Sequence, residues 1–161
     1  MEDRLDLVIR VGRAIDSSYV AIPFSKVNML LCASPDYVKQ HGQPKTLADL
    51  NNHNFMIFQK FNRYVFKRNN VQQELAVNGA LVSNSVASII HATVQGIGLS
   101  LLPDLLIQKE LRQGQLIEVM PEYVIDIKGL AVEQVFAMFS SRKQMPAKVR
   151  AFLDFYKSKF A

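Results

Sequence analysis

The chain of 161 residues is 49% hydrophobic and 20% charged, a composition typical of folded globular proteins that excludes an intrinsically disordered chain. No apolar run approaches the length of a membrane span and no basic-then-apolar signal segment opens the chain, so we expect a cytoplasmic protein with no membrane partner. The formal net charge is +5, but the basic residues are dispersed and accompany no helix-turn-helix pair or zinc-finger spacing. They therefore predict a solvated basic surface and not a DNA-binding element.

The first half of the chain alternates between strand patterns and short helices. Leucine, isoleucine or valine at every second position of residues 5–12 predicts a strand that ends at Gly12. Ser34 before Pro35 predicts the start of a short helix, and Gly42 predicts its end. The other elements expected in this half are two extended runs at 19–24 and 27–33, a short helix after a capping box at 46–49, a strand at 55–58, and a hairpin of strands 63–67 and 71–77 joined by an Arg-Asn-Asn turn.

Residues 83–103 form the most informative stretch. Its three opening residues, Ser83, Asn84 and Ser85, are all good helix N-caps, and apolar residues at helical spacing follow them. A Gly-Ile-Gly turn at 96–98 then leads into an apolar run of strand length that ends at a proline. A helix N-terminus at the carboxyl end of a strand leaves unpaired N–H groups that can receive a small anion. The same residues also fit an ordinary helix–strand unit in which they only cap the helix.

The last third of the chain continues the alternation. Asp104 is expected to open a helix over 105–111, and a strand at 116–119 follows. A final strand is expected at 135–139, and Pro146 is expected to start a terminal helix with one apolar stripe. Because strands and helices alternate along most of the chain, the sequence predicts an α/β fold with a mainly parallel sheet.

Four segments match one family in the right order. They are residues 6–12 (DLVIRVG), 31–38 (LCASPDYV), 83–103 (SNSVASIIHATVQGIGLSLLP) and 140–155 (SSRKQMPAKVRAFLDF). Each is similar to a segment of the effector-binding domain of LysR-type transcriptional regulators. Together they cover nearly the whole chain, so the chain resembles that family's C-terminal domain.

The resemblance implies a two-lobed, periplasmic-binding-protein-like α/β domain with mainly parallel sheets and two crossing strands. On this chain the first lobe would hold residues 1–33 and 131–161, the second would hold 34–130, and the crossings would fall near 31–34 and 130–134. The helix-turn-helix domain and the first strand and helix of the first lobe are expected to be missing. The first lobe would then be incomplete and N-terminally truncated, and its uncovered apolar surface favours a homodimer or homotetramer.

The resemblance also places three residue clusters around the cleft between the lobes. The candidate effector-binding residues are Gly12, Arg13, Ser34, Ser83, Asn84 and Ser85. Their hydroxyl groups, backbone donors and guanidinium group suit a small anionic or polar effector. The alternative is that the serine and asparagine residues only cap helices and that Arg13 is solvated.

Residues for other chemistries are lacking. The three histidines lie far apart in the sequence, with no cysteine or carboxylate at ligand spacing, so no metal or other cofactor is expected. Cys32 is the only cysteine and lies in an apolar run, which predicts a buried and inert thiol. No G-x-S-x-G elbow, P-loop or H-E-x-x-H motif occurs, so we expect no catalytic residue and no enzyme.

The sequence and the resemblance together favour a regulatory domain of a LysR-type DNA-binding transcription factor. Such a domain senses a small-molecule effector, and its DNA contacts come only from the missing N-terminal domain. A free-standing solute-binding protein of the same fold is the alternative, and an anion-handling enzyme is a third. A helix-turn-helix or a signal peptide in the sequence upstream of Met1 would separate the first two.

Overall fold

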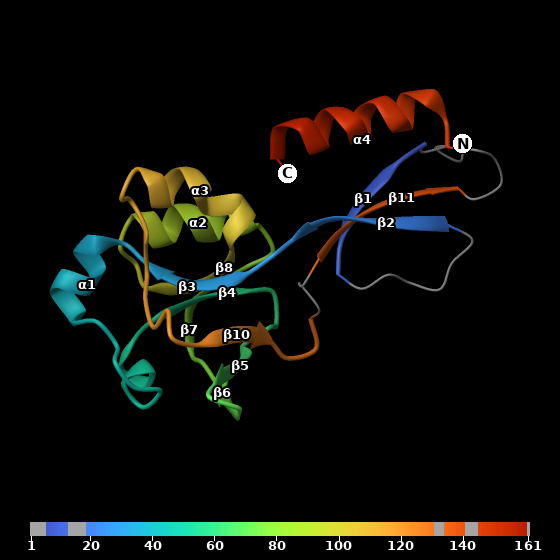
Figure 1. The fold of residues 1–161 in the computed structure, drawn as a ribbon. Coiled ribbons are helices and arrows are strands. Elements are labelled where there is room, and N and C mark those ends of the chain that lie inside the picture. The colour runs from blue at the N-terminus through green and yellow to red at the C-terminus, as the bar shows by residue number, and fades with distance from the viewer. Residues whose placement is uncertain (1–5, 13–18, 131–133, 141–144, 161) are drawn as a thin grey trace. The chain divides into compact units, whose positions relative to one another are not determined.

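The computed structural model describes residues 6–12, 19–130, 134–140 and 145–160. The chain forms two compact units (Figure 1). The first unit contains Met1–Val27 and Val132–Ala161, and the second contains Asn28–Ala131. The first unit is therefore built from both ends of the chain, and the second is a single continuous segment.

The first unit is a three-stranded antiparallel sheet covered by one helix. The strand order is β1 (Val8–Val11), β11 (Gln134–Ser140) and β2 (Tyr19–Lys26). The terminal helix α4 (Ala147–Phe160) packs on this sheet through its buried residues Val149 and Leu153, which contact Ala137 and Phe139 of β11. This packing matches the apolar stripe expected for a helix that starts after Pro146.

The second unit has three layers, as Figure 1 shows. Its central sheet has the order β7-β4-β8-β3-β9, and α2 and α3 cover one face of that sheet. A second sheet of order β10-β5-β6 packs on the other face. The elements of the unit are β3 (Met29–Ala33), α1 (Pro35–His41), η1 (Asp49–Asn52), β4 (Phe55–Phe58), β5 (Arg63–Arg68), β6 (Val71–Ala76), β7 (Gly79–Ser83), α2 (Val86–Val94), β8 (Leu99–Pro103), α3 (Asp104–Arg112), β9 (Ile117–Glu118) and β10 (Val124–Ile127).

The α/β class is confirmed, but the strand directions correct the expectation of mainly parallel sheets. Among the described strands, β4 pairs in parallel with β7 and β8, and all the other pairs are antiparallel. Strand β3 runs antiparallel to its neighbours β8 and β9. The hairpin β5–β6 is antiparallel because its two strands are joined by a two-residue turn. The central sheet is therefore mixed, and the other two sheets are antiparallel.

Local start and stop signals agree closely with the structure. The Ser34 hydroxyl accepts a hydrogen bond from the Tyr37 amide and caps α1, which ends before Gly42. The turn between β5 and β6 places Asn69 at φ 49° and Asn70 at φ 62°, the left-handed conformation that asparagine tolerates. Both turn and cap are confirmed as predicted.

Two strands were not expected from the sequence, and the chain passes between the units at an earlier residue than expected. Strands β7 and β10 each lie at the edge of a sheet; the side chains of β7 are mostly exposed, whereas Ile125 and Ile127 of β10 are buried. The chain enters the second unit at Asn28, ahead of residues 31–34, because β3 pairs with β8 and β9. Most of the second expected crossing, at 130–134, lies outside the described residues.

Candidate functional site

The N-terminal end of α2 follows directly after the edge strand β7. Ser85 caps the helix, since its hydroxyl accepts a hydrogen bond of 3.2 Å from the Ser88 amide. The hydroxyl of Ser83 accepts a bond of 3.1 Å from the Ser85 amide, and Asn84 between them is exposed. Within the described part of the chain, the amides of Val86 and Ala87 have no hydrogen-bond acceptor. Two backbone donors at this helix end therefore remain available to a ligand.

The strand register places the start of α2 at one end of the strands of the central sheet. Here, an edge of this sheet means one of the two edges formed by strand ends. Strand β4 runs parallel to β7 with Phe58 opposite Ser83, so both strands end beside the start of α2. Strand β8 is also parallel to β4 and ends at the same edge. Proteins with open α/β sheets usually bind their ligands at the carboxyl ends of neighbouring parallel strands. The site therefore lies where this fold class binds small molecules.

The same edge is where the chain enters the second unit. The Asn28 amide donates to Asp104 Oδ1 at 3.1 Å, and the Asn28 side chain donates to Asp104 Oδ2 at 2.8 Å. The Asp104 carboxylate also accepts a bond of 2.8 Å from the Leu105 amide. Asp104, which was expected to open a helix, is the first residue of α3. Its bonds hold Asn28, the first residue of the second unit, beside the end of β8.

Ser34 lies at the opposite edge of the central sheet from Ser83–Ser85. It follows β3, which is antiparallel to β8, so β3 ends where β8 begins. Its side chain is 3% exposed and is occupied by the Tyr37 amide at 3.2 Å. A Cβ added at Gly96, in the turn after α2, would lie 3.3 Å from the Ser34 hydroxyl. Ser34 therefore caps α1 beside the far end of α2, and the structure does not bring it together with Ser83–Ser85.

The remaining two candidate residues belong to the first unit. Gly12 ends β1 at φ 134°, and its amide donates to the Gln134 carbonyl oxygen at 2.9 Å. Its backbone thus continues the β1–β11 pairing by one residue. Arg13 lies outside the described residues.

A buried hydroxyl pair positions α2 on the sheet, and the sequence reasoning did not identify it. Thr93 Oγ1 and Ser100 Oγ are 2.6 Å apart, and both residues are 0% exposed. Thr93 Oγ1 also donates to the Ile89 carbonyl oxygen at 2.8 Å. The first residue is on α2 and the second on β8, so this bond ties the helix to the strand that it covers. A seven-residue separation of two hydroxyl residues gives no sequence signal for such a pair.

Close packing of the turn after α2 requires a glycine at position 98. A Cβ at Gly98 would overlap the Asn54 carbonyl oxygen and the Met56 methyl group. The Asn54 carbonyl also accepts a bond of 2.8 Å from the Leu99 amide. Gly98 therefore lets β8 start directly beside β4, as the predicted tight turn requires.

Three titratable residues of the second unit, Cys32, Tyr37 and His53, are buried. Cys32 is buried as expected, and burial followed by the nearby charge of Glu118 raises the pKa of its thiol to about 12. The Tyr37 hydroxyl lies 3.0 Å from His53 Nδ1. Burial, followed by the nearby His41, lowers the pKa of His53. In the described ranges, no group of three or more His, Cys, Asp or Glu residues could hold a metal ion.

No helix among the described residues is long and apolar enough to span a membrane.

The family model described as the LysR substrate binding domain matches residues 1–161. An HTH-type transcriptional regulator of Haemophilus influenzae is 30% identical over 152 residues, which cover 92% of this chain and 51% of that protein. The HTH-type transcriptional activator AaeR of Escherichia coli is 26% identical over 155 residues, which cover 94% of this chain and 48% of the activator.

The structure is similar to the regulatory domain of CrgA, a LysR-type transcriptional regulator from Neisseria meningitidis. The TM-score is 0.82 at 21% identity, and the match covers 99% of this chain and 78% of that chain. These matches confirm the resemblance drawn from the four sequence segments and the periplasmic-binding-protein-like fold. The relatives are transcriptional regulators and not enzymes. The chain spans about half the length of the curated relatives that it matches.

Proposed function

Because the chain belongs to the LysR substrate-binding domain family, we propose that it senses a small anionic or polar effector at the N-terminal end of α2. The effector's acidic or polar group accepts hydrogen bonds from the amides of Val86 and Ala87. The positive end of the helix dipole favours a negative charge at this position. The observation that carries the proposal is that these two amides lack an acceptor in the described protein, at an edge where three strands end.

The side chains around these amides determine what the site can accept. Asn84 is exposed and offers both a donor and an acceptor, which suits a ligand with a hydroxyl or amide group beside its acid. The hydroxyls of Ser83 and Ser85 accept bonds from protein amides, but each can still donate its own hydrogen. Gly12 and Arg13 stay candidates that the family resemblance alone supplies. Ser34 is not included, since its hydroxyl is buried at the far edge.

Effector binding acts on transcription through other parts of the protein. The two relatives described above are HTH-type regulators about twice the length of this chain, so DNA binding is assigned to a domain outside it. The effector favours one of two arrangements of the regulator's subunits and so changes how its DNA-binding domains are presented. A DNA-binding regulator of this kind works in the cytoplasm.

Self-association is supported by the first unit. Ile9 and Val11 of β1 and Val20 of β2 are exposed large apolar residues on one small sheet. Exposed apolar side chains on one sheet favour burial against another chain. We expect a homodimer or homotetramer, and light scattering over a dilution series should give a mass above that of one chain. A monomer at every concentration would contradict this part of the proposal.

The effector site is tested by removing one amide and leaving the fold unchanged. Val86 is the first residue of α2 and Ser85 before it is extended, so Val86→Pro is compatible with the backbone and breaks no internal hydrogen bond. Val86→Ala is the matched control, since it shortens the same side chain and keeps the amide. Thermal-shift screening of small carboxylates, phosphate and sulfate first identifies a ligand.

Calorimetric titration then compares the two variants. Losing one hydrogen bond to a charged ligand should weaken binding to Val86→Pro by roughly tenfold or more relative to Val86→Ala. Equal affinities of the two variants for the ligand would contradict the proposed site.

A further inference from the structure

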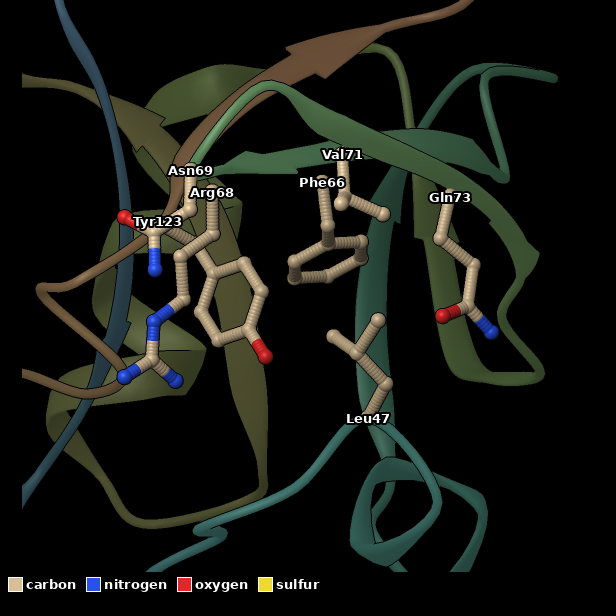
Figure 2. A pocket seen from close by; sticks show the side chains of 7 residues that line it. All are labelled: Leu47, Phe66, Arg68, Asn69, Val71, Gln73 and Tyr123. Carbon is tan, nitrogen blue, oxygen red and sulfur yellow. The ribbon is translucent and has the colours of Figure 1, made fainter.

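A hollow lies beside the β5–β6 turn in the second unit (Figure 2). Its volume is about 290 Å³. Phe66 of β5 and Val71 of β6 form one wall, and Leu47, from the segment before η1, points toward the Phe66 ring from the opposite side. The ring of Tyr123 stands beside them and meets Phe66 edge to face, with ring centroids 5.8 Å apart. The interior of this hollow, which we call the Leu47 pocket, is therefore apolar.

The rim of the Leu47 pocket is polar. The Arg68 guanidinium lies over the Tyr123 ring at 5.5 Å, on the side away from Gln73 in Figure 2. Its ion pair with Glu122 is a single contact of 3.9 Å, longer than a charge-assisted hydrogen bond of about 2.8 Å. Among the described residues, the side-chain amides of Asn69 and Gln73 make no hydrogen bond to the protein. Two side-chain amides that make no hydrogen bond to the described protein therefore line this apolar hollow together with Arg68.

Val71 shows that the apolar wall is open to solvent. It is 68% exposed at the start of an edge strand, although valine side chains are usually buried. A ligand's apolar body seated against Val71 and Leu47 would remove this surface from water, with the Phe66 ring, itself 1% exposed, behind them. Ligand pockets typically combine such apolar walls with a few polar groups that orient the ligand, and they start at about 300 Å³. The volume of the Leu47 pocket is therefore suited to a ligand with a single ring.

We propose that the Leu47 pocket binds a small apolar carboxylate, with its ring or branched chain inside and its carboxylate on Arg68. The planar guanidinium matches a carboxylate with two parallel N–H donors, which a lone contact with Glu122 does not provide. The bound carboxylate replaces Glu122 as the partner of Arg68. The negative charge of Glu122 opposes the ligand, so the proposal makes opposite predictions for the two residues of this ion pair.

The Leu47 pocket is separate from the effector site proposed at the N-terminal end of α2. Its residues come from the β10-β5-β6 sheet and the loops beside it, whereas α2 lies on the other face of the central sheet. None of Ser83–Val86 lines the pocket. Binding here does not depend on the effector site proposed above, and each can fail without the other.

Methyl NMR with phenylacetate as the probe tests the proposal on the whole chain. We expect shifts in the methyl signals of Leu47 and Val71, and unchanged signals for Val86 near the start of α2. Acetate lacks the ring and phenylacetamide lacks the charge, so both should bind at least about tenfold more weakly than phenylacetate.

Substitutions in the ion pair sharpen the test. Arg68→Gln should weaken phenylacetate binding about tenfold or more, and Glu122→Gln should strengthen it severalfold, because it removes the opposing charge. Arg112→Gln, on the exposed end of α3, is the matched control and should leave the affinity unchanged. If Arg68→Gln does not fold, Glu122→Gln still decides. Unchanged affinity in Glu122→Gln, shifts confined to Val86, or equal binding of phenylacetamide would overturn the proposal.

Discussion

Replacing Thr93 by valine should destabilise the second unit by about 1 to 3 kcal/mol, although the two side chains have nearly the same shape. The change removes the 2.6 Å contact with Ser100 and the 2.8 Å bond to the Ile89 carbonyl oxygen. Ser100 is 0% exposed, so its hydroxyl would lose its partner without gaining water. A buried polar group without a partner costs more than the hydrogen bond itself contributes.

Substituting Ser100 should be less damaging than substituting Thr93. In Ser100→Ala, Thr93 keeps its bond to the Ile89 carbonyl oxygen, so the expected loss is about 0.5 to 1.5 kcal/mol. The double variant Thr93→Val/Ser100→Ala leaves no unpartnered hydroxyl. It should therefore be more stable than Thr93→Val alone.

Hydrogen exchange of the buried β8 amides is the suitable assay, because it reports the opening of the second unit without requiring the whole chain to unfold in one step. The exchange rates of the four proteins give the free-energy differences directly. Additive losses in the double variant, or a loss for Thr93→Val no larger than that for Ser100→Ala, would refute the account of this pair.

Three further predictions concern single residues. Because burial raises its pKa to about 12, Cys32 should resist iodoacetamide at pH 8 in the folded protein and react fully in guanidinium; rapid labelling of the folded protein would contradict its burial. Burial lowers the pKa of His53 below its ordinary value of 6.5, so the unfolded chain binds more protons and stability should fall as the pH drops below about 6.5. Urea unfolding at several pH values should show a smaller fall in His53→Gln, and an identical fall would exclude His53 as its source. Gly98→Ala should lower the melting temperature more than Gly42→Ala, since only the first places a Cβ against the Asn54 carbonyl oxygen and Met56; the reverse order would contradict the close packing of β8 and β4.

Short-range signals allowed much of the fold to be predicted. The Ser34 cap, the end of α1 at Gly42 and the Asn69–Asn70 turn each depend on a few neighbouring residues, and all three are as expected. The edge strand β7 was missed because its side chains are mostly exposed, and β10 was missed because its four residues, with Ile125 and Ile127 buried, are too short a segment for a clear alternation. Strand direction is a long-range property, so the antiparallel pairing of β3 with β8 could not be inferred from either segment alone.

The candidate site shows the same division between local and long-range information. The cap-type residues before α2 were identified correctly as a helix start, because capping is local. Ser34 was grouped with them because the family resemblance places both clusters at the cleft, and the reversed direction of β3 puts Ser34 at the other edge of the sheet. The Leu47 pocket was not anticipated, since its residues come from three separate parts of the chain.

Amide NMR during a ligand titration measures directly whether the effector binds the free amides at the start of α2. For an anionic ligand found by screening, we expect the signals of Val86 and Ala87 to shift most, because they form new hydrogen bonds to a negative charge. The signal of Tyr37, whose amide is bound to Ser34 at the far edge, should stay in place. A ligand that binds while the Val86 and Ala87 signals remain unchanged would contradict the claim.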